Sequence, residues 1–160
     1  DIILDRENKD MDPITEMLLY AASRAQHVSQ VIGPALEEGK IVLCDRFVDS
    51  SIAYQGFGRG LGIELVEEAN RIALQGILPD LTLFFDLDPE EGLKRSNLRH
   101  READRLEMES LNFHKRVYEG FKALSLKYPQ RFKRVRAELG IDEIKLQIFN
   151  IISELPKYGK

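Results

Sequence analysis

Helical periodicity dominates the hydrophobic pattern of this chain. Apolar residues recur three and four positions apart over several stretches, which predicts amphipathic helices at about residues 14–32, 63–74, 89–95, 106–128 and 141–153. The first and third of these stretches follow the dipeptides Asp12-Pro13 and Asp88-Pro89. An aspartate can cap a helix, and proline is favoured at the first helical position, so both dipeptides mark helix starts.

Short apolar runs lie between the predicted helices. Residues 41–44 and 132–135 indicate short strands, and the almost continuously apolar run 81–87 is typical of a strand covered on both faces in a parallel sheet. Because strands alternate with helices, the sequence predicts a doubly wound α/β fold. Such a sheet would be thin, and the chain begins without methionine. We therefore expect at least one further strand–helix–strand unit, ordinarily about 30 residues or more, before Asp1 in the intact protein.

The composition changes this picture little. A chain of 160 residues with 43% hydrophobic and 31% charged residues suits one soluble domain, 1–160, with a real core. The net charge of −4 creates no field that would attract nucleic acid or an anionic membrane, so we expect neither as a partner. The apolar runs are too short to span a bilayer and no signal peptide is recognisable, which favours the cytoplasm. Cys44, the only cysteine, is predicted to be a small core residue.

The strongest candidate for chemistry is the segment 45–56, which follows the predicted strand 41–44. In open α/β sheets, ligands bind in the crevice beyond the strand ends. Arg46 could take a phosphate group with two parallel hydrogen bonds, or it could form a structural ion pair with Asp45 or with a neighbouring helix. Asp45 could hold Mg²⁺ through water or orient a phosphoryl acceptor, or it could cap the next helix. The chain contains no Gly-x-x-x-x-Gly-Lys-[Ser/Thr] loop, which is the loop that usually binds the phosphates of a nucleoside triphosphate.

Other polar residues could read a nucleotide base. Tyr20 and Arg24 are four residues apart and share one face of the first predicted helix, where a tyrosine ring could stack and an arginine could donate to a base carbonyl. Ser51 and Gln55 offer a hydroxyl and an amide suited to the edge of a base. Ordinary interpretations stand beside these: Tyr20 as a core residue, Arg24 as a solvated side chain, and the other two as turn or cap residues.

A basic stretch and a glycine-rich stretch complete the candidates. Residues 94–105 carry five Lys/Arg against two acids, so this segment could act as a lid that closes over phosphates and neutralises their charge; a solvated helix end is the alternative. Residues 56–62 predict a mobile, glycine-rich connector. The three histidines are scattered without metal-ligand spacing, which, with a single cysteine, argues against structural zinc.

Taken together, these segments resemble the bacterial thymidylate kinases. The motifs that carry the resemblance stand in family order between about Asp5 and about Tyr128, and they are long enough to be specific. They are Asp12-Pro13-x-Thr15-Glu16 with Leu18-Leu19-Tyr20-Ala21-Ala22-Ser23-Arg24-Ala25-Gln26-His27, Asp45-Arg46-Phe47, Ser50-Ser51-x-Ala53-Tyr54-Gln55-Gly56, Gly58-Arg59-Gly60, Pro79-Asp80-Leu81-Thr82, Asp86-Leu87-Asp88-Pro89-Glu90-Glu91-Gly92-Leu93 and Asp104-Arg105-Leu106-Glu107.

The resemblance implies a fold and an activity. The fold is a P-loop kinase-type parallel sheet flanked by helices, and the activity is transfer of the ATP γ-phosphoryl group to dTMP, giving dTDP, with ATP and Mg²⁺ as cofactors. The family is homodimeric, and the apolar faces of the helices at 14–32 and 63–74 could form the interface. The first strand and the P-loop of the family would precede Asp1, so we expect the 160-residue chain alone to be inactive.

The resemblance also assigns the residues that would bind the nucleoside part of dTMP. The position of Tyr20 stacks on thymine, and that of Arg24 bonds a thymine carbonyl. The positions of Ser51 and Gln55 read the base edge. Tyr54 matches the position beneath the deoxyribose, where a ribose 2′-hydroxyl would clash.

Further residues are implied at the phosphates. Arg46 matches the arginine that holds the acceptor phosphate, and Asp45 matches the carboxylate that faces the P-loop and the metal, without ligating the metal directly. Arg99 and Arg101 lie in the lid, at about 95–105, and Arg105 stands at its end. These five residues are the catalytic candidates.

Two alternatives stay open at this point. The first is a non-catalytic nucleotide-binding or dimerisation module that keeps the acceptor site without a donor site. The second is another nucleoside monophosphate kinase, which the pair Arg24 and Gln55 disfavours. Mass spectrometry of the purified polypeptide would test the first alternative, since a mass well above 18.4 kDa would mean that a P-loop segment exists. A panel of nucleotide substrates would test the second.

Overall fold

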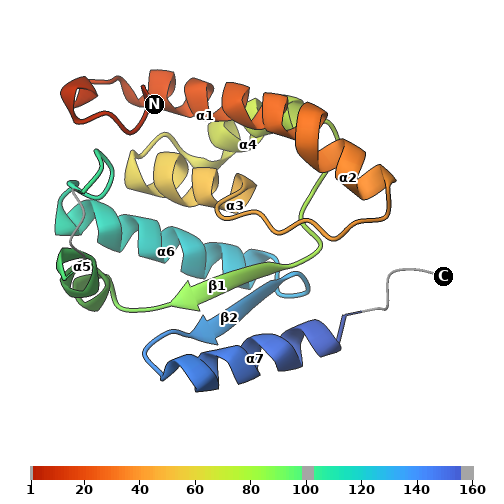
Figure 1. Ribbon diagram of the computed structural model, residues 1–160. Coiled ribbons are helices and arrows are strands. Elements are labelled where there is room, and N and C mark those ends of the chain that lie inside the picture. Colours follow the sequence, from red (N-terminus) through yellow and green to blue (C-terminus); the bar gives the residue numbers. More distant parts are fainter. Residues whose placement is uncertain (1, 99–102, 156–160) are drawn as a thin grey trace.

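Helices surround a small parallel sheet in the computed structural model, which describes residues 2–98 and 103–155 (Figure 1). The strands are β1 (Thr82–Asp86) and β2 (Phe132–Arg136). Helices α1 (Pro13–His27), α4 (Ile63–Leu74) and α6 (Leu111–Lys127) lie on one side of the strands, and α7 (Ile141–Ser153) lies on the other. The shorter helical segments are η1 (Arg6–Asn8), η2 (Val28–Ile32), α2 (Gly33–Glu37), α3 (Val48–Ser51), η3 (Ile52–Gly58) and α5 (Pro89–Asn97).

The predicted helices are confirmed, and the first runs further than expected. Asp12 caps α1, because its Oδ1 accepts the backbone N–H of Ile14 at 2.8 Å. The helical path then continues through the π-helical segment η2 into α2 and ends at Glu37. Asp88 caps α5 in the same way, and the predictions for 63–74 and 141–153 match α4 and α7.

Helix α6 begins later than the hydrophobic pattern predicts. The carboxylate of Asp104 accepts the backbone N–H groups of Leu106 and Glu107, each at 2.9 Å, and so holds residues 104–107 in a turn. The helix begins after Ser110, whose Oγ accepts the backbone N–H of Phe113 at 3.2 Å. The turn at Asp104 and the cap at Ser110 therefore set the start of α6, and the spacing of apolar residues reveals neither of them.

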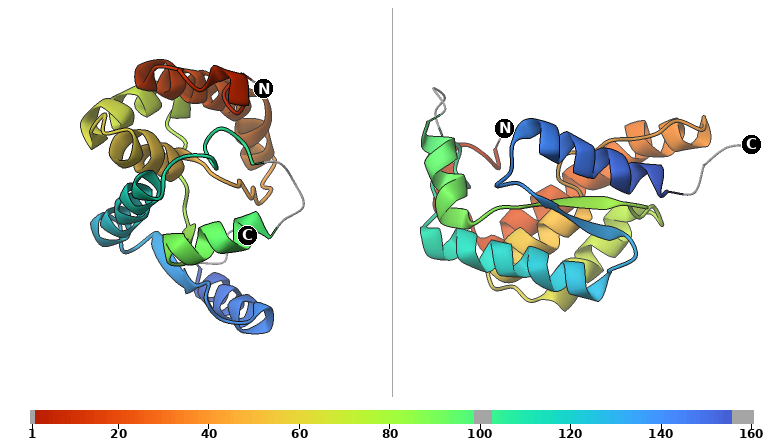
Figure 2. Two further views of the ribbon diagram at one scale, coloured as in Figure 1. Left: turned by 90° about the vertical axis from the view of Figure 1, so that its left-hand side faces the viewer. Right: turned by 90° about the horizontal axis from the view of Figure 1, so that it is seen from below.

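The sheet is parallel, as predicted, and its register pairs Thr82 with Phe132 and Asp86 with Arg136. In Figure 1 and in the left view of Figure 2, α7 lies beyond β2, away from α1. Phe84 of β1 is buried, whereas its neighbour Phe85 is 51% exposed. Because successive side chains of a strand point to opposite faces, the expectation of a strand covered on both faces is wrong for the part of the chain that the structure describes.

The predicted strand at 41–44 is not a strand. The segment is irregular, and the side chains of Ile41 and Leu43 are 89% and 91% exposed. Cys44 is exposed as well, so the expectation of a core cysteine is also wrong. A strand needs a neighbour for its backbone N–H and C=O groups, and β1 and β2 pair only with each other among the described residues. An apolar run predicts burial but cannot supply that neighbour.

The glycine-rich stretch 56–62 is helical in its first part, residues 56–58, and irregular from residue 59 to residue 62. Gly56 and Gly58 are buried within η3, and only the residues after Gly58 leave the helical path. A Cβ atom at Gly58 would lie 2.7 Å from the ring of Phe113. The glycine therefore allows α6 to pack directly on η3.

Gly120, on the facing side of this contact, should not tolerate a methyl group. A Cβ at Gly120 would lie 2.9 Å from the ring of Phe57 and 3.0 Å from the Cα of Ala53. Alanine is better than glycine in a helix by about 1 kcal/mol, but overpacking costs about 1–3 kcal/mol. We expect Gly120→Ala to lower the free energy of unfolding, measured by urea titration.

Gly92→Ala is the matched control, since Gly92 also lies within a helix and its Cβ would meet nothing closer than 3.8 Å. This variant should gain about 0.5–1 kcal/mol. A gain of the same size for Gly120→Ala would contradict the proposed close packing.

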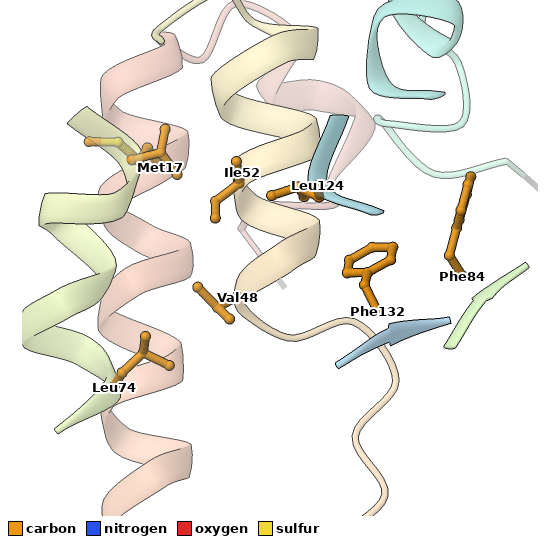
Figure 3. Close-up of a cluster of buried hydrophobic side chains, with 8 residues drawn as sticks. Met17, Val48, Ile52, Leu74, Phe84, Leu124 and Phe132 are labelled. Carbon is orange, nitrogen blue, oxygen red and sulfur yellow. The ribbon is translucent and has the colours of Figure 1, made fainter. Parts of the chain in front are cut away.

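A hydrophobic core joins these elements. Its buried side chains come from α1, α3, η3, α4, α6 and both strands: Met17, Val48, Ile52, Val66, Leu74, Phe84, Leu124 and Phe132. In Figure 3, Phe84 and Phe132 project from the strands toward the helices, and Met17 and Leu74 lie among the helices. A second cluster holds η3 against α6 through Ala53, Leu106, Phe113 and Val117. Within the described residues, no helix is both long and apolar enough to cross a membrane.

Candidate active site

A large open cavity lies between α1, the segment before α3, and the end of β1. Its volume is about 980 Å³, which is in the range of small-molecule sites. We call it the main cavity. A smaller hollow of about 50 Å³ adjoins it, lined by Tyr20, Arg24, Arg46, Ser50, Ser51, Tyr54, Gln55 and Leu106. We call this second space the side hollow.

Most of the residues singled out in the sequence meet here. All six candidates for binding dTMP line the side hollow: Tyr20, Arg24, Arg46, Ser51, Tyr54 and Gln55. Asp45 lines the main cavity. Arg105 is buried and is not among the lining residues of either space. Arg99 and Arg101 lie outside the described residues.

Arg46 adopts an unusual backbone conformation. Its φ of 62° is in the left-handed region, which few residues other than glycine adopt and which costs about 1–3 kcal/mol. The guanidinium carbon lies 4.8 Å from the centre of the Tyr54 ring. Among the described residues, no carboxylate pairs with Arg46, so the structural ion pair considered above is not found. The exposed guanidinium keeps its N–H groups for an anion.

Arg24 is buried and held from several sides. It is 8% exposed, and its Nη2 donates to the backbone carbonyl of Phe47 at 3.1 Å and to Ser51 Oγ at 2.9 Å. Its Nη1 donates to Asn70 Oδ1, and Asn70 is in turn oriented by donating to Val66 at 2.8 Å. Burial lowers the pKa of Arg24. The interpretation of Arg24 as a solvated side chain is therefore wrong.

The sequence alone did not single out Glu16, yet its carboxylate is the centre of a buried network. Glu16 is 0% exposed, and it accepts hydrogen bonds from Gln55, Arg59 and Arg105. Burial by itself would raise the pKa of Glu16, but the hydrogen bonds from Arg59, Gln55 and Arg105 outweigh burial and lower it. One signal was present in the sequence: Glu16 adjoins Met17 on the apolar stripe of the first helix, where a carboxylate needs partners.

A second, partly buried ion pair joins α3 to the sheet. Arg131 donates to both oxygens of Asp49, each at 2.7 Å, and Thr82 Oγ1 donates to the same carboxylate at 2.7 Å. The hydrogen bond to Asp49 raises the pKa of Arg131. Because Asp49 lies in α3, Thr82 begins β1 and Arg131 precedes β2, the pair fixes Arg46 and Ser51 relative to the sheet. Sequence reasoning missed this pair as well.

The opposite wall of the main cavity carries two further polar groups. Tyr118 donates its hydroxyl to Asp86 at 2.7 Å, which raises the pKa of Tyr118 to about 12. His114 also lines the cavity, and its Nε2 is the only buried side-chain polar atom of the described residues without a hydrogen-bond partner. Among those residues, no three His, Cys, Asp or Glu side chains gather as a metal cluster.

Comparisons with known proteins point to one family. A sequence model of the family described as thymidylate kinase matches residues 1–148. A thymidylate kinase of Thermoanaerobacter sp. (strain X514) is 54% identical over 158 residues, which cover 99% of this chain and 75% of that relative. A thymidylate kinase of Clostridium novyi (strain NT) is 51% identical over 145 residues, or 90% of this chain and 71% of that one.

A solved structure supports the fold. The crystal structure of thymidylate kinase from Ehrlichia chaffeensis is 29% identical to this chain, with a TM-score of 0.70, and the match covers 89% of this chain and 67% of that one. The predicted fold class, a P-loop kinase-type parallel sheet flanked by helices, is thereby confirmed. The family match over most of the chain and the near-complete alignment to close relatives lead to one conclusion: this chain belongs to the thymidylate kinase family.

Proposed function

We propose that this protein is a dTMP kinase that transfers the γ-phosphoryl group of ATP to dTMP, giving dTDP. Membership of the family supports phosphorylation of dTMP. The observation that carries the proposal is the side hollow, where base-reading candidates, Tyr20, Arg24 and Gln55, stand beside an arginine with free N–H groups, Arg46. A nucleoside monophosphate offers both partners, a hydrogen-bonding ring and an anion.

The thymine ring would enter the side hollow. Arg24, which can only donate, suits a thymine carbonyl, and its bonds to Phe47 and Ser51 hold the guanidinium still. Tyr20 would pack against the ring, and Gln55 would meet the base edge. Tyr54 would lie beneath the deoxyribose and disfavour ribonucleotides.

The acceptor phosphate would lie against Arg46, at the opening of the side hollow into the main cavity. Asp45 is exposed on the wall of that cavity and would hold Mg²⁺ through water, which fits an ion that commonly takes one or two carboxylates beside substrate phosphates. The ion would offset negative charge on the phosphates. Arg99 and Arg101 remain predicted lid residues. Arg105 would act through Glu16, to which it donates at 2.5 Å.

A substrate panel tests this proposal. With ATP as donor, the full natural protein should phosphorylate dTMP with a kcat/KM on the order of 100-fold or more above that for dCMP, because cytosine offers an amino donor where thymine offers a carbonyl. UMP should also be a poor substrate. Equal rates with dTMP and dCMP would leave only a generic nucleoside monophosphate kinase.

Arg24→Ala should lower activity toward dTMP and narrow its advantage over dCMP. The buried arginine would no longer oppose the cytosine amino group, so discrimination should fall by about tenfold. Arg116→Ala is the matched control, since Arg116 also donates to a backbone carbonyl, that of Gly58, at 2.8 Å, without lining either space. An unchanged dTMP-to-dCMP ratio in Arg24→Ala would contradict the assigned role.

We also propose that the protein acts as a homodimer in the cytoplasm, as the family resemblance suggests. Helices α1 and α4 each carry exposed apolar side chains, among them Leu18, Leu65 and Ile72, which a second copy could cover. Sedimentation of the natural protein should then give twice the monomer mass, and Ile72→Glu should shift it toward monomer. A monomer at all concentrations would contradict the proposed dimer.

A further inference from the structure

We propose that Glu16 is a specificity-determining positioning residue, which fixes the direction of the Gln55 side-chain amide so that Gln55 turns a carbonyl oxygen toward N3 of the bound base. The inference rests on the proposed function, because it concerns which base the same site accepts. The preference of the site for thymine would then depend on Glu16, whose side chain does not line the side hollow.

The contact between the two side chains permits one orientation only. Gln55 Nε2 donates to Glu16 Oε1 at 2.8 Å, and the two residues are 1% and 0% exposed. An ionised carboxylate accepts hydrogen bonds and cannot donate them. If the amide were reversed, its oxygen would face a carboxylate oxygen in a buried site, where the repulsion is weakly screened. The amide NH₂ group must therefore face Glu16.

The Glu16 carboxylate cannot turn away, because both of its oxygens are occupied. Arg59 donates through Nε to Oε1 at 3.2 Å and through Nη2 to Oε2 at 2.9 Å. Arg105 donates to Oε2, and its own Nε donates to the backbone carbonyl of Ile3 at 2.8 Å. Arg59 is fixed further by Glu109 and by the ring of Phe113, whose centre lies 4.7 Å away. The network also keeps Glu16 ionised, since these hydrogen bonds lower its pKa.

With its NH₂ group committed, Gln55 has its Oε1 left for the side hollow, which this residue lines. We find no donor to this oxygen among the described residues. Thymine carries a proton on N3 and can donate to Oε1, whereas N3 of cytosine is an acceptor. A cytosine would set one lone pair against another in a buried site, so discrimination on the order of 10- to 100-fold is expected from this contact.

The test compares dTMP with 5-methyl-dCMP, two ligands that differ only at N3 and C4 of the base. Titration calorimetry of the protein should give a Kd for dTMP at least about tenfold lower than for 5-methyl-dCMP. In Glu16→Gln, an amide oxygen at the Oε2 position still accepts from Arg59 Nη2 and Arg105. The NH₂ group at the Oε1 position gives up the long contact with Arg59 Nε, which is 3.2 Å in the wild type, and can donate to Gln55. The Gln55 amide can then reverse and offer NH₂ to the base, so the ratio of the two Kd values should fall at least about tenfold.

The control is Arg59→Met, which loosens the same network but keeps the contact between Glu16 and Gln55. Its melting temperature should fall while the Kd ratio stays at the wild-type value. If Glu16→Gln does not fold, the double variant Glu16→Gln/Arg105→Gln keeps the net charge of the cluster and gives the same comparison.

The outcomes separate this inference from the proposed function. A reduced ratio in Glu16→Gln with an unchanged ratio in Arg59→Met supports the inference. If Glu16→Gln weakens both ligands equally, or if Arg59→Met reduces the ratio as much, Glu16 is a structural residue only and the inference is overturned, while the proposed function stands. A wild-type protein that binds both ligands equally would refute the base-reading role of Gln55 itself.

Discussion

Replacing Arg46 with alanine is expected to reduce kcat/KM for dTMP by about 100- to 1000-fold in the full natural protein. A guanidinium fork that donates two charge-assisted hydrogen bonds to a phosphate cannot be replaced by water, and Arg46 has no other ion partner among the described residues. The backbone should tolerate the change, because the left-handed φ of 62° suits glycine or alanine no worse than arginine. Steady-state kinetics with dTMP and ATP measure the effect.

Two further variants make this result specific to Arg46. Arg71→Ala, which removes an exposed arginine paired with Glu68 three residues away, should change activity little, since solvent screens an exposed ion pair and Arg71 lines neither space. Arg46→Gly should lose activity like Arg46→Ala while remaining at least as stable as the wild type, because glycine relieves the strained backbone. Near-normal kcat/KM in Arg46→Ala would show that the phosphate lies elsewhere.

Removing the Glu16 carboxylate should cost about 3–5 kcal/mol of folding stability. Glu16→Ala would leave Arg105, which is buried, and Arg59, which is partly buried, without their shared anion, and uncompensated buried charge is expensive. Urea denaturation measures the loss. The matched control is Glu68→Ala, whose exposed pair with Arg71 is screened by solvent and should contribute much less to folding stability. Equal losses for the two variants would contradict the central role of the network.

The same network predicts how stability depends on pH. The pKa of Glu16 is lower in the folded protein than its ordinary value of 4.5, so the folded state binds the proton less readily than the unfolded chain. The stabilisation is therefore complete above about pH 4.5 and is lost as the pH falls through the folded pKa. The stability gap between wild type and Glu16→Ala should be widest at neutral pH and should narrow in acid. A constant gap from pH 7 to pH 3 would mean that Glu16 titrates normally.

The helices were predictable because their signals are local. Apolar spacing marked 63–74 and 141–153 with the bounds that α4 and α7 adopt, and the Asp-Pro dipeptides marked the starts of α1 and α5. The prediction of a strand at 41–44 was wrong, because strand formation depends on a neighbouring strand that the apolar run itself does not specify. The sequence also did not predict that Gly56 and Gly58 belong to η3. Glycine permits either a flexible loop or a close contact between helices, and which one forms depends on the partner helix.

The residues that line the candidate site could be predicted from the sequence. The residues that hold these side chains in place could not. Tyr20, Arg24 and the segment around Arg46 could be named from helix spacing and family resemblance, although the strand expected before Arg46 does not form. The residues that orient them could not, because their contacts join distant parts of the chain. Glu16 and Gln55 are 39 positions apart, and Glu16 and Arg105 are 89 apart. No local pattern links such pairs, and each residue alone reads as an ordinary charged or polar side chain.

A crystal structure of the protein with dTMP bound would test the assigned site directly. We expect the thymine ring to lie in the side hollow, against Tyr20 and within hydrogen-bond distance of Gln55 Oε1. We also expect a phosphate oxygen within hydrogen-bond distance of the Arg46 guanidinium. Density for dTMP elsewhere in the main cavity, or a phosphate that makes no contact with Arg46, would contradict the proposed binding of dTMP.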